Sequence, residues 1–211
     1  MSEIETETPR GLARVHLTHP PGQTASAALV LGHGAGGGIG APDLQAARRA
    51  ATDVGLAVAL VEQPYRVAGR RAPAPASHLD EAWVAVISRL TARELSGFSL
   101  ICGGRSMGAR VACRTAVLTG ARGVLCLAFP LLPPARAGGR PPSSRLPELE
   151  SVPVGVLVVQ GERDRFGIPP PGPRRSVVVV TGDHALRGDL GAVGEAVQNW
   201  LQGILGGAKV A

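Results

Sequence analysis

Short, almost wholly apolar segments that alternate with longer segments of helical periodicity constrain the fold of this chain most. Such runs are typical of strands buried on both faces of a parallel sheet, with helices as the connections. The apolar runs are residues 27–31, 55–62, 98–102, 123–129, 154–160 and 176–180. The helical segments are residues 43–54, 78–95, 107–118 and 190–205. The pattern predicts an α/β fold: a mainly parallel twisted sheet flanked by helices.

The length and the connections predict a single domain. The chain has 211 residues, close to the roughly 100–200 residues of a typical domain, and contains no fixed-period repeat. We expect a flexible N-terminus over residues 1–10 and one domain over residues 11–211, with an edge strand at residues 12–17. The connection from residue 130 to 153 has room for one short helix, near residues 144–150, and for no large lid.

Composition excludes several classes of protein. Hydrophobic residues make up 45% of the chain, which supplies a sizeable core and argues against a disordered protein. No apolar run approaches the ~18–20 residues of a membrane span. The start, MSEIETETPR, lacks the basic and apolar regions of a secretory signal. We therefore expect a cytoplasmic protein with no membrane partner.

The positive charge does not indicate a nucleic-acid partner. The formal net charge is +6, but aromatic residues, which stack on bases, are only 3% of the chain. The three cysteines, Cys102, Cys113 and Cys126, lie in apolar segments without CxxC spacing. They are predicted to be small buried side chains. We expect no metal ion and no organic cofactor.

The motif Gly104-Arg105-Ser106-Met107-Gly108 lies between a predicted strand and a predicted helix. A tight turn in this context strains the serine backbone and raises its hydroxyl above the sheet. The flanking glycines relieve collisions that a Cβ would cause. Ser106 is therefore a candidate nucleophile, although a serine helix cap between ordinary turn glycines would give the same five letters.

A nucleophilic serine needs a base and an acid that orients the base. His184 is the only histidine after Ser106, and it directly follows the last strand. Asp164 follows the preceding strand, so both lie where open α/β sheets build their sites. Glu162 is the second candidate for the acid, and Asp183 adjoins the histidine.

A glycine-rich segment, residues 32–38, follows the first buried strand. Ester hydrolysis passes through an anionic oxygen that needs two N–H donors, and we expect these donors at Ala35 and at Met107. His33, Gly34 and Gly36 are the predicted substrate contacts.

The same segment also matches a dinucleotide-binding pattern. Gly32, Gly34 and Gly37 fit G-x-G-x-x-G, and Glu62 ends the next strand, where an acid would bind ribose. A dinucleotide-binding oxidoreductase is thus an alternative. It requires the helix to start at the glycines, whereas the helical pattern begins near Pro42.

Five segments together resemble the α/β-hydrolase superfamily, especially its short members akin to dienelactone hydrolase and the group typified by testis-expressed protein 30. In chain order they are LGHGAGGG, GGRSMGAR, LAFPLLPP, VVQGERDRFG and GDHAL. The resemblance implies an α/β-hydrolase fold, with Ser106 as nucleophile, His184 as base and Asp164 as the orienting acid.

The resemblance also implies a hydrolase, a carboxylesterase or thioesterase that acts on a small-molecule ester. A hydrolase-shaped interaction protein with little turnover remains an alternative. One departure concerns residues 166–175, FGIPPPGPRR. The family has a crossover helix here, and this proline-rich stretch is too short for one. The placement of Asp164 depends on that connection.

Overall fold

The structure, a computed structural model, describes residues 2–22, 25–133 and 143–207. In these ranges one sheet is formed by β1 (Ser2–Thr8), β2 (Gly11–Thr18), β3 (Ala27–Gly32), β4 (Ala57–Glu62), β5 (Ser99–Arg105), β6 (Gly123–Leu127), β7 (Gly155–Gly161) and β8 (Arg175–Val180). Their spatial order is β1-β2-β4-β3-β5-β6-β7-β8. β2 pairs antiparallel with both β1 and β4, and every other pairing is parallel.

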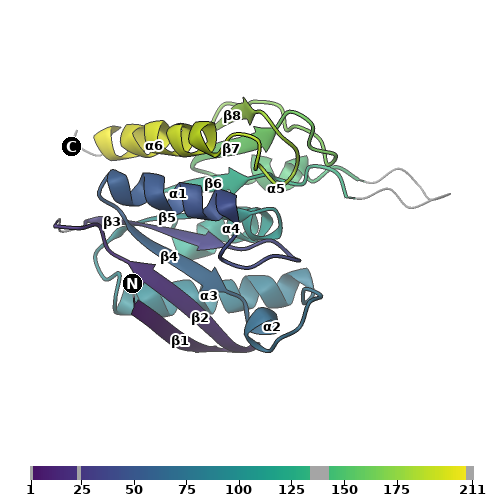
Figure 1. Cartoon of the computed structure of the whole chain (residues 1–211). Helices are drawn as coiled ribbons and strands as arrows, with labels where there is room; N and C mark the ends of the chain where they lie inside the picture. Colours follow the sequence, from purple (N-terminus) through teal and green to yellow (C-terminus); the bar gives the residue numbers. More distant parts are fainter. Residues whose placement is uncertain (1, 23–24, 134–142, 208–211) are drawn as a thin grey trace.

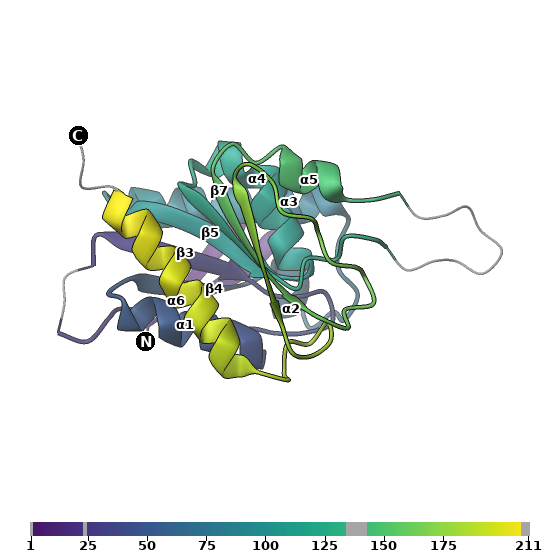
Figure 2. The same cartoon turned by 90° about the horizontal axis from the view of Figure 1, so that it is seen from above.

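Helices cover both faces of the sheet. They are α1 (Pro42–Asp53), α2 (Pro64–Val67), α3 (Ala76–Ala92), α4 (Met107–Thr119), α5 (Leu146–Glu150) and α6 (Leu190–Gly207). Figures 1 and 2 show α1 and α6 side by side on one face, with α3 and α4 on the other. The predicted α/β fold, with helices on both sides of a mainly parallel sheet, is confirmed.

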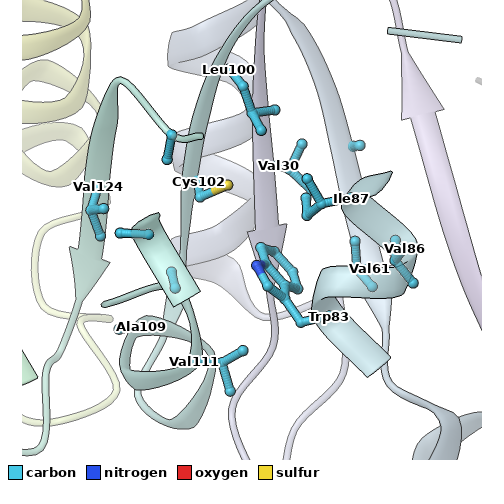
Figure 3. Close-up of a cluster of buried hydrophobic side chains, with 14 of the residues drawn as sticks. Val30, Val61, Trp83, Val86, Ile87, Leu100, Cys102, Ala109, Val111 and Val124 are labelled. Carbon is cyan, nitrogen blue, oxygen red and sulfur yellow. The ribbon is translucent and has the colours of Figure 1, made fainter. Parts of the chain in front are cut away.

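The core consists of two apolar layers, one on each side of the sheet. Side chains alternate across a strand, and in β3 they do so between the layers. Ala28 and Val30 join the layer under α3 and α4, whereas Leu29 and Leu31 join the layer under α1 and α6. Figure 3 shows the first layer, in which Trp83 of α3 lies among aliphatic side chains of the sheet. The near-continuous apolar runs of the sequence follow from this two-sided burial.

The N-terminus differs from the prediction. Residues predicted to be flexible form β1, which pairs along its whole length with β2. Glu3 and Glu5 form ion pairs with Arg14 of β2, and Thr6 is buried. The alternation of charged residues with Ile4 and Thr6 is that of an edge strand with one covered face.

The connection between β7 and β8 contains no helix. Residues 162–174 lead from one strand to its parallel neighbour as turns and extended chain. The Arg175 guanidinium donates from Nε to the carbonyl of Pro170, at 2.7 Å, within this proline-rich stretch. This connection therefore lacks the crossover helix of the family. The end of β7 and the residues that follow it, Asp164 among them, nevertheless keep the predicted order after the strand.

Three further predictions concern the short helix near residue 144, the cysteines and the lack of a membrane span. The short helix expected near residues 144–150 begins at Leu146, as α5, and α2 adds one helical turn between β4 and α3. All three cysteines are buried. Among the described residues no helix has both the length and the apolar character needed to cross a membrane.

Candidate active site

Ser106 occupies the turn between β5 and α4. Its backbone has φ 51° and ψ −106°, in the region that L-residues rarely adopt. The Ser106 N–H donates to the carbonyl of Leu127 in β6, at 2.8 Å, which holds the turn against the neighbouring strand. Strain of this kind persists only where surrounding contacts determine it. The hydroxyl therefore stands at the carboxyl end of the parallel strands, in the predicted position.

The two motif glycines permit a close approach between backbones. A Cβ on Gly104 would lie 2.5 Å from the carbonyl oxygen of Gly32, and a Cβ on Gly108 would collide with the same oxygen. The β5–α4 turn is thus packed directly on the end of β3. This contact brings the segment after β3 next to Ser106.

His184 lies between the hydroxyl and a buried carboxylate. Its Nε2 is 3.0 Å from Ser106 Oγ, and its Nδ1 is 2.8 Å from Asp164 Oδ2. Because a carboxylate only accepts hydrogen bonds, this geometry assigns the proton to Nδ1. Nε2 then has a lone pair for the serine hydroxyl, which is the arrangement of a nucleophile, a base and an orienting acid.

Asp164 is held by its own turn and by Gln160. The side chain of Asp164 is fully buried. Its Oδ1 accepts the N–H of Phe166 at 2.9 Å, and its Oδ2 accepts Gln160 Nε2 at 2.7 Å. Gln160, the penultimate residue of β7, was not predicted as a site residue. The signal that could have identified it in the sequence is a glutamine at the end of an apolar run, four residues before the candidate acid.

The other two acids face away from the histidine. Glu162 is exposed and pairs with the adjacent Arg163. Asp183 is also exposed, and its Oδ1 accepts the N–H of Ala185 at 2.8 Å. Of the candidate acids, only Asp164 contacts the ring of His184 in the described part of the chain.

Residues 33–38, the oxyanion loop, lie beside the nucleophile. A Cβ on Gly34 would be 3.7 Å from Ser106 Cβ, and Gly36 is exposed at the loop surface. Within the described residues, neither Ala35 N–H nor Met107 N–H donates to a backbone carbonyl. Met107 begins α4, where N–H groups have no partner in their own helix. Neither of the two predicted oxyanion donors is therefore occupied by a backbone carbonyl among the described residues.

The prediction that His33 contacts substrate is not supported by its position. The side chain of His33 is fully buried beneath the oxyanion loop. Its Nε2 accepts the N–H of Gln63 at 3.1 Å, and its Nδ1 is 2.9 Å from the Gly34 carbonyl oxygen. Burial lowers the pKa of His33, consistent with a neutral ring that donates from Nδ1.

This contact orients the peptide that carries the expected oxyanion donor. The carbonyl of Gly34 and the N–H of Ala35 belong to one trans peptide, so they point in opposite directions. With the oxygen directed at His33, the N–H is directed away from the core. Tyr65 adds a second anchor, since its hydroxyl donates to the Ala35 carbonyl at 2.8 Å.

The dinucleotide alternative does not fit this geometry. A pyrophosphate would need the N-terminus of α1, but Asp43 places its own carboxylate there, with Oδ1 accepting the N–H of Leu44 at 2.9 Å. Glu62, the candidate ribose ligand, is 3.2 Å from Nε2 of His16. In addition, a Cβ on Gly32 would contact the Trp83 ring, so this glycine serves packing within the core.

One side of the site is apolar. The Phe166 ring meets His184 edge-on, with 4.5 Å between ring centroids, and the N–H of Leu132 donates to the Phe166 carbonyl at 2.9 Å. Leu132 and Ile168 are 38% and 41% exposed, two of the few large apolar side chains at the described surface. We call Leu132, Phe166 and Ile168 the apolar rim.

Among the described residues no group of three or more metal-ligating side chains occurs.

The sheet order, the strained serine turn and the Ser106–His184–Asp164 contacts define the α/β-hydrolase class of fold. Residues 25–187 match the family model described as an alpha/beta hydrolase domain. The chain belongs to this alpha/beta hydrolase family. No curated protein matches its sequence.

Solved structures with the same fold include several hydrolases. A serine hydrolase homologue from Coxiella burnetii has a TM-score of 0.75 at 18% identity, covering 95% of this chain and 97% of that one. A serine hydrolase without a lid from Xanthomonas campestris has a TM-score of 0.72 at 18% identity, with 94% of both chains covered. Est1E from Butyrivibrio proteoclasticus has a TM-score of 0.78 at 14% identity, with coverage of 98% and 100%. These likenesses establish the fold.

Proposed function

We propose that the protein is a serine hydrolase that cleaves small ester or thioester substrates through an acyl-enzyme. The observation that carries the proposal is the chain of contacts from Ser106 Oγ to His184 Nε2, at 3.0 Å, and from His184 Nδ1 to Asp164 Oδ2, at 2.8 Å. Membership of the alpha/beta hydrolase family supports the same reaction class.

Acylation begins when Ser106 Oγ attacks the carbonyl carbon of the substrate and His184 Nε2 takes the hydroxyl proton. The carbonyl oxygen becomes an anion, which the N–H groups of Ala35 and Met107 stabilise. One such donor contributes roughly 10²–10³ in rate. His184 then gives its proton to the leaving alcohol or thiol as the bond to the acyl carbon breaks. Asp164 stabilises the imidazolium and keeps the ring oriented.

Deacylation repeats these steps with water. His184 Nε2 removes a proton from water, and the hydroxide oxygen attacks the acyl carbon. When the tetrahedral intermediate collapses, Ser106 Oγ leaves and recovers a proton from His184. The products are a carboxylic acid and the original enzyme.

The apolar rim supports a substrate with a compact apolar group beside the reacting carbonyl. Phe166 contacts the His184 ring, Leu132 is hydrogen-bonded to Phe166 through its backbone, and Ile168 follows two positions later in the chain. Leu132 and Ile168 are exposed, and burying their hydrocarbon contributes roughly 25 cal/mol per Å². Among the described residues between β6 and β7, α5 is the single helix, so this part of the chain supplies no multi-helix lid. We therefore propose short-chain or small aromatic acyl esters over long-chain lipids.

The test is a comparison of aryl esters and acyl thioesters of increasing chain length. The proposal predicts turnover of the short members by the wild-type protein, a loss of turnover in Ser106→Ala, and a higher KM when Ile168 is changed to Ser. Appreciable cleavage of long-chain triglycerides without any cleavage of short acyl esters would contradict the proposed substrate class. A protein that is folded and cleaves none of them would favour the interaction-protein alternative.

A further inference from the structure

The side chain of Arg105 contacts three segments that meet at the candidate active site. Arg105 ends β5 and immediately precedes Ser106. Its Nη2 donates to the backbone carbonyl of His184 at 2.9 Å. A Cβ on Gly34 would lie only 2.7 Å from Arg105 Nη1, so the guanidinium is packed against the oxyanion loop. The same group thus touches the loop that carries the base and the loop that carries an oxyanion donor.

The guanidinium of Arg105 also forms an ion pair with a buried carboxylate, that of Asp43. Asp43, in the first turn of α1, is fully buried, and its Oδ2 is 2.9 Å from Arg105 Nε. Burial raises the pKa of Asp43, and the charge of Arg105 opposes that rise. Because a buried ion is costly to desolvate unless an opposite charge lies beside it, the Asp43 carboxylate keeps the Arg105 guanidinium close by.

The planar guanidinium gives this arrangement its geometry. Arg presents its N–H donors in a rigid fork, whereas Lys presents a point charge on a flexible stem. The Asp43 carboxylate lies beside Nε, while Nη2 donates to the His184 carbonyl and Nη1 packs against Gly34. The residue contacts no reacting atom.

We propose that Arg105, oriented by Asp43, is a positioning residue that fixes the His184 loop relative to the nucleophile and to the oxyanion loop. This inference rests on the proposed function. Ser106, His184 and Gly34 come from three separate loops, and the side chain of Arg105 contacts both the His184 loop and the oxyanion loop. Without it, the 3.0 Å approach of His184 to Ser106 loses a restraint on the backbone of the base.

Arg114 provides a matched control. It is 20% exposed in its side chain, compared with 18% for Arg105, and it forms a two-point ion pair with Asp80 at 2.6 and 2.8 Å. This pair links α4 to α3, away from the His184 and oxyanion loops. Arg105→Gln and Arg114→Gln each remove an Arg–Asp pair, in which the carboxylate is fully buried for Asp43 and 24% exposed for Asp80. Only Arg105→Gln affects the proposed contacts.

The experiment measures two quantities on wild type, Arg105→Gln, Arg105→Lys and Arg114→Gln. The first is the rate constant for labelling by a fluorophosphonate, with kcat and KM for a short aryl ester. The second is hydrogen exchange of the backbone amides at residues 182–188 and 33–37. In Arg105→Gln we expect labelling and kcat to fall about 10- to 100-fold, KM to change little, and exchange in both segments to accelerate. Arg114→Gln should match the wild type within about twofold.

Arg105→Lys separates geometry from charge. It compensates Asp43 and should recover thermal stability, but it should not restore labelling. Should Arg105→Gln prove unfolded, the double variant Asp43→Asn/Arg105→Gln removes the orphaned carboxylate and is measured instead. Wild-type labelling and exchange in the glutamine variant, or full recovery of labelling with lysine, would overturn the inference. If the wild type itself is not labelled, the proposed function fails, and unchanged exchange would then separately overturn the positioning role.

Discussion

His184 Nε2 lies 3.0 Å from Ser106 Oγ although the two residues are 78 positions apart in the chain. The parallel sheet explains this proximity. β5 and β7 both direct their carboxyl ends to one edge, with β6 between them and β8 beside β7. The loops that follow β5, β7 and β8 therefore converge on one surface, where open α/β sheets place their sites.

Replacing Asp164 by Asn should abolish most of the turnover. The amide cannot hold the Nδ1–H tautomer as the carboxylate does, and such a change lowers kcat by roughly 10⁴-fold in a serine triad. Glu162→Gln is the control, because this exposed carboxylate pairs only with Arg163 in the described part of the chain. Steady-state kinetics on a short aryl ester measures both variants. Equal losses in the two would refute the assignment of Asp164.

Removing the Tyr65 hydroxyl should impair the oxyanion loop. Tyr65 is buried, and burial raises its pKa to about 12, so the hydroxyl remains a donor to the Ala35 carbonyl throughout the neutral range. A lost hydrogen bond of this kind is worth about 1 kcal/mol. We expect Tyr65→Phe to lower kcat about five- to tenfold with little change in KM.

The control for the tyrosine variant is Thr115→Val. It removes another buried hydroxyl, one that donates to the Val111 carbonyl at 2.7 Å within α4. Its kcat should equal that of the wild type. A Tyr65→Phe protein with wild-type kcat would show that the hydroxyl does not support the loop.

Adding a methyl group at Gly104 should destabilise the fold. Its Cβ would meet the Gly32 carbonyl oxygen at 2.5 Å, a backbone atom that cannot move without shifting β3. Overpacking of this kind costs about 1–3 kcal/mol. Gly203→Ala should instead stabilise by roughly 0.5–1 kcal/mol, because outside the backbone of α6 no described atom lies within 4 Å of the new Cβ. Urea denaturation measures both, and the opposite order would contradict the close β3–β5–α4 packing.

His33 should make stability depend on pH. Burial lowers its pKa below the ordinary value of 6.5, so the unfolded chain takes up a proton before the folded chain does. The stabilising effect is complete above pH 6.5 and is lost as the pH falls toward the lowered pKa. His33→Gln removes this titration. The decrease in free energy of unfolding between pH 7 and about pH 5 should be smaller in the variant than in wild type, and equal slopes would contradict the burial argument.

The elements that could be predicted from the sequence are those whose own residues show the pattern of burial. Residues 27–31 and 123–129 could be assigned because burial on both faces of a sheet requires unbroken apolar runs. Ser106, Asp164 and His184 could be identified because each follows a strand, and chain order restricts their roles. β1 was missed because only Ile4 and Thr6 alternate with glutamates whose partners, in β2, are known only once the hairpin forms.

The supporting contacts of the site depend on tertiary structure. Between Asp43 in α1 and Arg105 at the end of β5, the chain forms one strand and two helices, and no local pattern relates the two residues. His33 was predicted to contact substrate because the sequence shows that it lies in the loop but not which way its ring points. The structure places that ring beneath the loop, where it orients the peptide of Ala35.

The most direct test of the account is the intact mass of the protein after incubation with a fluorophosphonate. Attack by Ser106 Oγ on phosphorus expels fluoride and leaves one phosphonyl group on the enzyme, provided that His184 takes the hydroxyl proton. We expect a single addition to the wild type, none to Ser106→Ala, and a greatly slowed addition to His184→Ala. A well-folded wild type that gains no mass, or a Ser106→Ala variant that is still labelled, would contradict it.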